Sequence, residues 1–478
     1  MTVVEPQTHN TTGNKPAERA ETVPYAPQGA APETESTAAT AARVPQPAAG
    51  TELFGEYQGS GYAEPRYLVR RADGQVIQLT ALLNLTLRAI DGTADQSTIA
   101  QRVTAGFGRE VTAENVAYLI EHKLQPAGLV LPEDGAATPL PRTDLLLALR
   151  GRCTLVRPPM VRFLARMLAW IHRPLIVAAV LLGVVVLDVW LFAVHGAAGP
   201  LVSVLTRPTL MLAVLGLGIG SMVFHEFGHA SACHYSGARP GRIGCGIFLV
   251  WPSMYTDVTD VYRVGRAGRL RTDLGGVYFN TVFILALAGC YALTGQPVYL
   301  AAILFVHFEI IDQLLPILRF DGYFLLADIV GVPDLFGRVG PILRDLLPTR
   351  LRPRSSAAQL PTALRRGARV GATTWVLVTL PLLGGEMVWM FWHLPSLIRT
   401  TAHSISVFAL AVFHDCVHHL WAQAGVDALA IALLAIPVIG LSWLSWRILT
   451  RLLRLAARRM SPPLALALAA ARGGRHRR

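Results

Sequence analysis

Five consecutive residues, His225-Glu226-Phe227-Gly228-His229, form an HExxH motif at the end of a long apolar run. In a helix this spacing places both imidazoles on one face, where they can bind one zinc ion with the glutamate beside them as general base. The preceding residues 210–224 are typical of a membrane-buried helix. The alternatives to a metal site are that the motif arises by chance or that its histidines only satisfy hydrogen bonds in the core. Because ionisable groups are costly at such depth and usually functional, the motif favours a zinc hydrolase with an intramembrane site.

A catalytic zinc site also needs a third protein ligand and an open position for water. A candidate lies where the fourth apolar span returns to the same side of the membrane, with Leu315-Pro316 followed by Phe320-Asp321-Gly322. Pro316 breaks the helix, and Gly322 lets the backbone pass closely. The second and fourth spans run in the same direction, so Asp321 is predicted to lie at a depth similar to that of the two histidines.

The fourth span carries further polar residues that are unusual inside a membrane, namely His307, Glu309, Asp312 and Gln313. Intramembrane groups of this kind are candidates for function. We expect Glu309, Asp312 and Gln313 to line a water path or to orient the zinc ligands. None of them is predicted to be catalytic.

Composition indicates a polytopic membrane protein with a smaller soluble part. Of 478 residues, 52% are hydrophobic and 15% are charged, whereas soluble domains carry about 25% charged residues. Arginine carries almost all of the net charge of +12, and these arginines cluster beside apolar spans, which argues against a nucleic-acid partner. The five cysteines include no CxxC pair, so neither a zinc ribbon nor a disulfide framework is indicated.

Length and apolarity predict six membrane spans, near 175–194, 208–231, 276–294, 298–318, 372–394 and 426–446. Arginines are concentrated in every second connection between the spans. The positive-inside rule therefore places both termini and the HExxH end of the second span on the cytoplasmic side. We therefore expect a multi-pass protein of the inner, cytoplasmic cell membrane. Residues 400–421 are predicted to be an outer interfacial or re-entrant piece, and 447–478 a basic cytoplasmic tail.

The first part of the chain is predicted to be soluble. Residues 1–50 are polar, lack a signal peptide and are expected to be a disordered arm. Residues 51–135 are expected to fold as a small α+β domain, with a hairpin over 66–79 and helices over 81–90, 95–107 and 112–123. Residues 136–174 are interpreted as a linker and a basic membrane-surface helix. The predicted fold class is therefore mainly α: a polytopic membrane helical bundle with a winged-helix-like N-terminal domain.

The segment over 51–135 resembles the PqqD-like peptide-recognition domains of ribosomal-peptide biosynthesis. The resemblance is carried by the hairpin, by QLTALLNLTLRAIDGTADQSTIAQRV and by the closing AGLVLP. Such domains hold a leader peptide as an added strand at the sheet edge. The resemblance implies that a precursor peptide is a partner. A DNA-binding winged helix is the alternative, but the second predicted helix is not strongly basic.

Residues 205–335 resemble the core of the site-2 protease family of intramembrane zinc metalloproteases. HEFGH matches the family's HExxH, Leu315-Pro316 with Phe320-Asp321-Gly322 matches its LDG motif, and Gly276-Val277-Tyr278-Phe279-Asn280 matches its GPxxN. Phe320 replaces the usual Leu, and Val277 replaces the Pro. The longer phrase LPILRFDGYFLLAD resembles a bacterial subgroup of the family that has an N-terminal PqqD-like domain and is often tied to peptide natural products, such as the daptides.

This second resemblance implies a zinc metalloendopeptidase whose transmembrane domain covers residues 175–446. His225, His229 and Asp321 would bind one Zn²⁺ per chain, and Glu226 would be the catalytic base. Asn280 would donate a hydrogen bond to substrate or oxyanion, with helix packing an equal alternative. The implied reaction is hydrolysis of a peptide bond in a ribosomally made precursor. The lipid bilayer and other peptide-modifying enzymes are the further partners that this resemblance implies.

Three other functions stay open at this point. His414, His418 and His419 resemble a histidine box of membrane di-iron oxidases, although the predicted topology places them opposite HEFGH. A non-enzymatic scaffold that binds a precursor peptide is the second, and a zinc carrier is the third. Within proteolysis, leader removal and the regulatory cleavage of a signalling membrane protein, such as an anti-sigma factor, are not separated by the sequence.

Overall fold

The computed structural model describes residues 3–4, 44–132, 150–196, 199–200, 208–248, 251–346 and 364–450, except positions 422, 437, 444 and 448. The chain divides into two compact units, Met1–Thr143 with Gln359–Ala363, and Asp144–Ala358 with Leu364–Arg478. Most of the predicted arm over 1–50, the linker over 136–149 and the tail beyond 450 lie outside the described residues.

The first unit holds a four-stranded sheet in the order β1-β4-β3-β2. Its strands are β1 (Val3–Val4), β2 (Glu52–Glu56), β3 (Arg66–Arg70) and β4 (Val76–Thr80). Strands β3 and β4 pair antiparallel, which confirms the predicted hairpin. Gly74 has φ +84° in the turn, a conformation that favours glycine. β2 extends the sheet beyond β3, and β1 pairs in parallel with β4 on the opposite edge.

Three helices complete this unit, and each begins at a side chain that accepts a backbone hydrogen bond. They are α1 (Ala81–Ala89), α2 (Gln96–Phe107) and α3 (Ala113–Leu119), with a π-helical turn at Ile120–Leu124. Thr80, Asp95 and Thr112 cap them, because each side-chain oxygen accepts the N–H three residues later. Apolar residues of the helices and of β3 and β4 form one core. The three predicted helices are therefore present within one residue at their N-termini.

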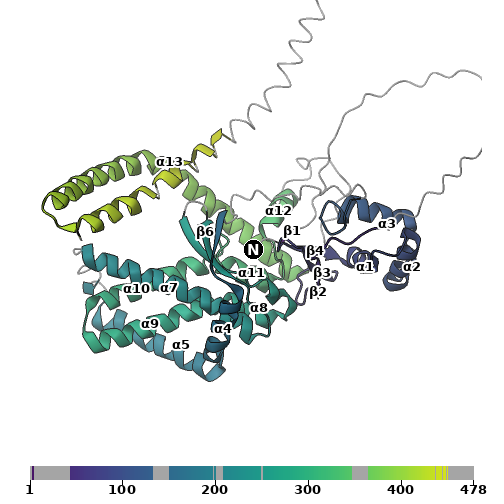
Figure 1. Ribbon diagram of the computed structural model, residues 1–478, viewed down its shortest axis with the longest axis horizontal. Helices are drawn as coiled ribbons and strands as arrows, with labels where there is room; N and C mark the ends of the chain where they lie inside the picture. The colour runs from purple at the N-terminus through teal and green to yellow at the C-terminus, as the bar shows by residue number, and fades with distance from the viewer. Residues whose placement is uncertain are drawn as a thin grey trace, which may run out of the picture. The chain divides into compact units, whose positions relative to one another are not determined.

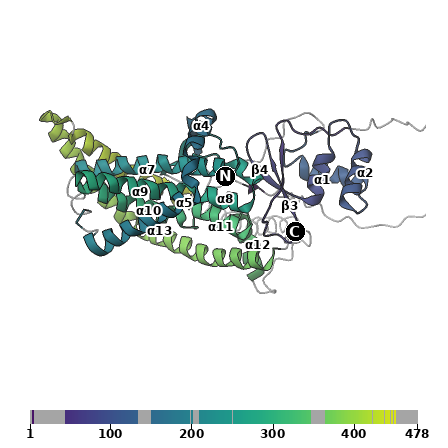
Figure 2. The same cartoon turned by 90° about the horizontal axis from the view of Figure 1, so that it is seen from below.

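The second unit is a helical bundle (Figure 1). Its helices are α4 (Pro158–Leu168), α5 (Pro174–Val189), α7 (Pro208–Tyr235), α8 (Arg266–Asp273), α9 (Gly275–Thr294), α10 (Pro297–Leu314), α11 (Asp321–Val330), α12 (Val339–Leu346) and α13 (Arg366–Val417). Short helical turns occupy Ala169–His172, Trp190–His195, Thr259–Arg263 and Phe336–Arg338. Helices α7, α9 and α10 lie alongside one another in the centre (Figure 2).

Six helices of the described part are long and apolar enough to cross a membrane: Pro174–His195, Leu210–Tyr235, Gly275–Thr294, Pro297–Leu314, Arg366–Val417 and Gln423–Arg447. They correspond in order to the six predicted spans. The large apolar side chains that remain exposed on them are expected for surfaces that face lipid. A mainly helical, multi-pass membrane bundle is therefore the fold of this unit.

Two predicted boundaries in this unit are wrong. The fourth span ends at Leu314 rather than 318, because the chain leaves the helix before Pro316. Residues 400–417 are not a separate interfacial piece, since α13 continues through Pro381 and Pro395 to Val417. At 52 residues, this helix is about 78 Å long, more than twice the roughly 30 Å of a hydrocarbon core.

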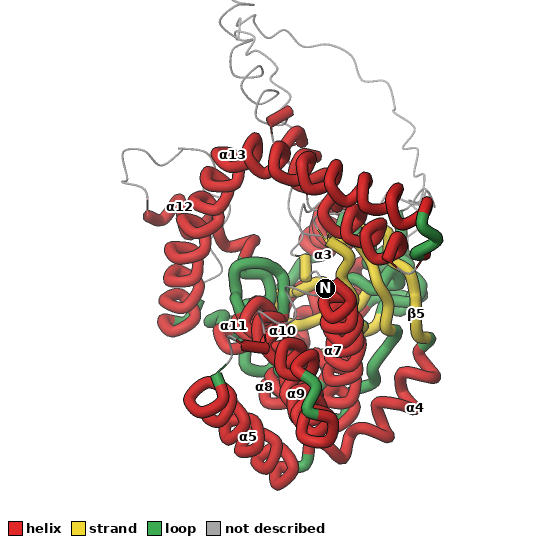
Figure 3. Tube along the Cα trace, turned by 90° about the vertical axis from the view of Figure 1, so that its left-hand side faces the viewer, coloured by secondary structure: helices red, strands yellow, loops and turns green. Residues whose placement is uncertain are grey.

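A three-stranded antiparallel sheet, which the sequence did not lead us to expect, stands beside α7 (Figure 3). It has the order β5-β6-β7, with β5 (Arg150–Val156), β6 (Ile243–Phe248) and β7 (Trp251–Thr256). The prediction that residues 136–174 are only a linker and a surface helix is therefore wrong over β5. A helix is present in this range, since α4 buries Val161 and Ala165 against Ala230 of α7, and its place at the membrane surface stays a prediction.

Candidate metal and catalytic site

The HExxH motif lies in the second half of α7, where this helix packs very closely on α9. A Cβ at Gly228 would overlap the carbonyl of Gly275, and a Cβ at Gly275 would lie 2.6 Å from the carbonyl oxygen of Gly228. Two facing glycines thus allow the two backbones to touch. This contact brings the start of α9 directly against the face of α7 that carries the two histidines.

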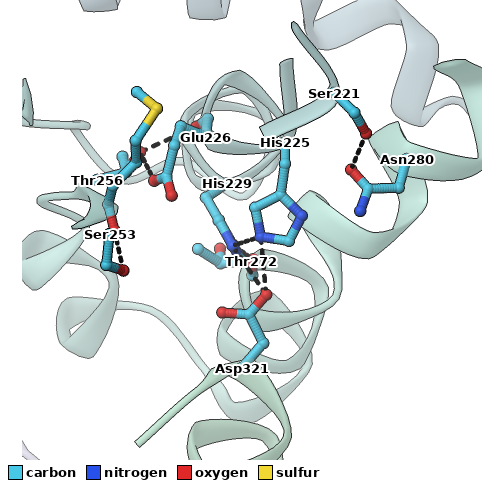
Figure 4. A network of polar contacts seen from close by, with 10 residues as sticks. Ser221, His225, Glu226, His229, Ser253, Thr256, Thr272, Asn280 and Asp321 are labelled. Atoms are coloured by element: carbon cyan, nitrogen blue, oxygen red, sulfur yellow. Dashed lines mark hydrogen bonds and ion pairs between the residues drawn. The ribbon is translucent and has the colours of Figure 1, made fainter. Parts of the chain in front are cut away.

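Three ligating atoms converge between α7 and α11. Asp321 Oδ2 lies 3.0 Å from His225 Nε2 and 3.1 Å from His229 Nε2, and the two Nε2 atoms are 3.1 Å apart. Zinc with tetrahedral ligands at about 2.0 Å would separate these atoms by about 3.3 Å. Within the described residues, this is the one group of three or more His, Cys, Asp or Glu side chains able to hold a metal ion. Figure 4 shows the three side chains pointing toward one another.

Asp321 reaches this position through a tight connection between α10 and α11. A Cβ at Gly322 would overlap the carbonyl of Leu314, so the return of the chain requires glycine there. The indole of Trp375 on α13 donates to the carbonyl oxygen of Pro316 at 2.6 Å and holds the connection. Asp321 is the first residue of α11, where the helix dipole favours a carboxylate.

The electrostatics of Asp321 suit a metal ligand. Burial raises its pKa, but the imidazoles of His229 and His225 lower it further, so the net shift is to below the ordinary value. The carboxylate is therefore ionised at neutral pH. Two imidazoles and one carboxylate with converging atoms are a ligand set typical of catalytic zinc. The residues present thus fit the predicted ion.

Glu226 is buried next to this group and is held by the sheet. Thr256, the last residue of β7, donates its hydroxyl to Glu226 Oε2 at 2.6 Å. One carboxylate oxygen is therefore oriented by a hydrogen bond, and the other is left for a proton transfer. Sequence reasoning missed Thr256. The alternation of glycine with apolar residues in β6 and the Met254-Tyr255-Thr256 run were the available strand signals.

A backbone carbonyl orients His229. Its Nδ1 lies 2.8 Å from the carbonyl oxygen of Thr272 in α8, so the Nδ1–H donates and Nε2 faces Asp321. An outer partner of this kind fixes the ring and tautomer of a zinc-binding histidine. Gly276 at the start of α9 covers the other side, because a Cβ there would overlap the Nε2 atoms of both histidines.

Asn280, the proposed hydrogen-bond donor to substrate, is buried one turn after Gly276 on α9. Ser221 of α7 donates to its side-chain oxygen at 3.5 Å. The buried position suits both of the roles considered, so its contact with substrate stays a prediction.

The remaining polar residues of α10 divide into two groups. Glu309 lies near Ser221 and His225, on the inner side of the bundle. Asp312 is exposed and Gln313 is half-buried. His307 points away from the metal group and contacts Asp188 of α5 at 3.1 Å. Of the predicted orienting residues, the structure thus brings Glu309 toward the histidines, and Asp312 away from them.

The second histidine cluster is separate from the first. His414, His418 and His419 are exposed at the end of α13, with the rings of His414 and His418 4.4 Å apart. None of them belongs to the metal group formed by His225, His229 and Asp321. The described residues therefore do not assemble the combined histidine set of a di-iron oxidase.

Comparison with known proteins finds a partial similarity. The chain is 28% identical over 119 residues to the "Putative peptide zinc metalloprotease protein YydH" of Bacillus subtilis (strain 168). The match covers 24% of this chain and 47% of that relative, so it spans less than half of the relative's length. No protein-family model matches the chain, and no solved structure matches it. The similarity supports a metalloprotease, without defining its substrate.

Proposed function

We propose that this protein is an intramembrane zinc metalloendopeptidase that cleaves a ribosomally made precursor peptide recruited by its first unit. One observation carries the proposal: His225, His229 and Asp321 bring three ligating atoms within 3.0 to 3.1 Å of one another. Glu226 stands beside them inside a helix that is long and apolar enough to cross a membrane. The similarity to a named peptide zinc metalloprotease supports the same class of reaction.

The mechanism follows from the positions of the side chains. His225, His229 and Asp321 would hold a zinc ion, which would supply a Lewis acid that lowers the pKa of a bound water. Glu226 accepts a proton from the water while the water oxygen attacks the scissile carbonyl carbon. Glu226 then passes this proton to the leaving amine while the C–N bond breaks. Thr256 keeps the carboxylate of Glu226 aimed at these two positions.

Substrate access imposes a condition on the peptide. A helix in the membrane has its backbone groups locked in internal hydrogen bonds, so its scissile bond must leave the helix before water can attack. The sheet β5–β7, whose last residue Thr256 contacts Glu226, offers polar backbone groups beside the site. The buried polar residues Ser221 and Asn280 line the neighbouring helix faces.

Recruitment by the first unit is supported by its sheet and by its resemblance to peptide-recognition domains. β2 and β4 are short strands near the two edges, and an extended peptide can pair with such an edge. The proposed location is the cytoplasmic membrane with both termini in the cytoplasm, as the arginine distribution predicts.

The test is co-expression of the full chain with small open reading frames that lie beside its gene, followed by mass spectrometry of the peptides. Glu226→Gln should abolish processing while zinc remains bound. Glu386→Gln makes the same chemical change at an exposed glutamate of α13 and should process normally. Unchanged processing in Glu226→Gln would refute catalysis and favour the scaffold, and metal transport without cleavage would favour the zinc carrier.

A further inference from the structure

A charged pair is buried behind the metal group. Arg269 of α8 is completely buried, and its Nε donates to Asp328 Oδ1 of α11 at 2.9 Å. Its Nη1 also donates to the carbonyl oxygen of Val264 at 3.2 Å. Asp328 is only 6% exposed. Removing two charges from water is costly, and an apolar pair of similar size often gives equal or greater stability. The pair therefore calls for an explanation beyond core packing.

The position of each partner supplies that explanation. Arg269 lies three residues before Thr272, whose carbonyl orients His229. Asp328 lies seven residues, or two helical turns, after Asp321 and therefore on the same side of α11. The ion pair thus joins the helix that orients one ligand to the helix that carries another.

Two further ionisable groups lie near the pair. Asp273 is the other carboxyl group beside Asp328, and burial followed by the charge of Asp328 raises its pKa well above the ordinary value. This shift favours the protonated, neutral form of Asp273. The pKa of the buried Tyr262 phenol is raised as well, by burial and then by Asp328. Beside these groups, Asp328 contacts the guanidinium of Arg269 at 2.9 Å.

We propose that Arg269 and Asp328 are positioning residues that set the distance between His229 and Asp321, and so tune the affinity of the site for zinc. This inference rests on the proposed metal site. Because Arg269 is completely buried and Asp328 is 6% exposed, the pair acts through Thr272 on one side and through α11 on the other. Partners one step removed from a metal commonly change its affinity by about 10- to 100-fold.

The experiment measures zinc affinity of the full chain in detergent by competition with a chromophoric chelator. Asp328→Asn and Arg269→Met should each weaken zinc binding by about 10- to 100-fold. Arg269→Lys retains the cation but not the planar fork, so we expect an intermediate loss. Arg263→Met is the matched control, because Arg263 forms an Arg–Asp pair with Asp260 on the exposed surface and should bind zinc like the wild type.

A second readout separates positioning from a structural role. The visible spectrum of Co²⁺ bound in place of zinc reports the ligand geometry, and it should change in Asp328→Asn but not in Arg263→Met. Lower thermal stability with unchanged zinc affinity and an unchanged Co²⁺ spectrum would overturn the proposal. Failure of all three variants of the pair to fold would assign it to the core, and would overturn it equally. If the wild type bound no zinc, the proposed function itself would fail, which is a distinct result.

Discussion

Gly276→Ala tests the geometry of the metal group most directly. The new Cβ would lie 2.5 Å from Nε2 of His229 and would overlap Nε2 of His225. An unstrained contact needs about 3.5 Å, so either the imidazoles or the start of α9 must move by about 1 Å. Zinc–ligand distances tolerate changes of only about 0.2 Å. The substitution should therefore separate the two histidines from Asp321.

The expected effect is large and specific. A displacement of about 1 Å at a catalytic centre costs about 100-fold in activity, and we expect a loss of similar size in zinc affinity. Chelator competition and peptide mass spectrometry measure the two quantities. Gly289→Ala is the matched control on the same helix, since a Cβ there meets nothing within 4 Å. Both changes raise helix propensity by up to about 1 kcal/mol, so a general effect of replacing glycine would appear in both.

One outcome would refute the geometry. If Gly276→Ala bound zinc and cleaved peptide like the Gly289→Ala control, then α9 would not cover the histidines as described. The close contact of Gly228 with Gly275 would then lose its role in assembling the site.

Three further changes probe the residues around this centre. Thr256→Val removes the hydroxyl bound to Glu226, so kcat should fall about tenfold at unchanged zinc content. Thr256→Ser keeps a hydroxyl and should retain the rate. Equal kcat values in the two variants would exclude the orienting role. Asn280→Ala should lower kcat by about 100-fold if the amide stabilises the developing oxyanion, and an unchanged kcat would assign Asn280 to helix packing. Replacing His418 and His419 together by Ala should leave one zinc per chain in elemental analysis, because neither residue joins the metal group; a loss of metal would revive the di-iron alternative.

The ligands could be predicted because their spacing is local or is tied to a helix break. His225 and His229 are four residues apart on one helix, and Pro316 with Gly322 marks the place where the chain turns back. Capping residues such as Thr80 likewise predict where a helix begins, because the cap and the residues it bonds are neighbours in the sequence. Periodicity and turn chemistry determine these features without any knowledge of the rest of the fold.

The features that were missed depend on contacts between distant segments. β5 pairs with β6 although α4, α5 and α7 lie between them in the chain. Thr256 of β7 contacts Glu226, which lies 30 residues earlier in the chain. The end of α13 was missed for another reason. The positive-inside rule favours a separate piece over 400–421, because a further crossing would place the Arg-rich tail outside. The helix nevertheless continues through Pro395 to Val417, and in apolar surroundings a proline can be accommodated within a helix.

The pairing of Val3–Val4 with β4 has a consequence for recruitment. A strand edge has a single row of unpaired N–H and C=O groups, and opposite Val76 and Ile77 this row is already taken by the beginning of the same polypeptide. A leader peptide that binds at this edge must displace Val3–Val4. Because this segment belongs to the same chain, its effective concentration does not fall on dilution. If the proposed leader binds at this edge, removal of Val3–Val4 should increase the affinity for the precursor peptide. If it binds at the β2 edge, the same removal should leave the affinity unchanged.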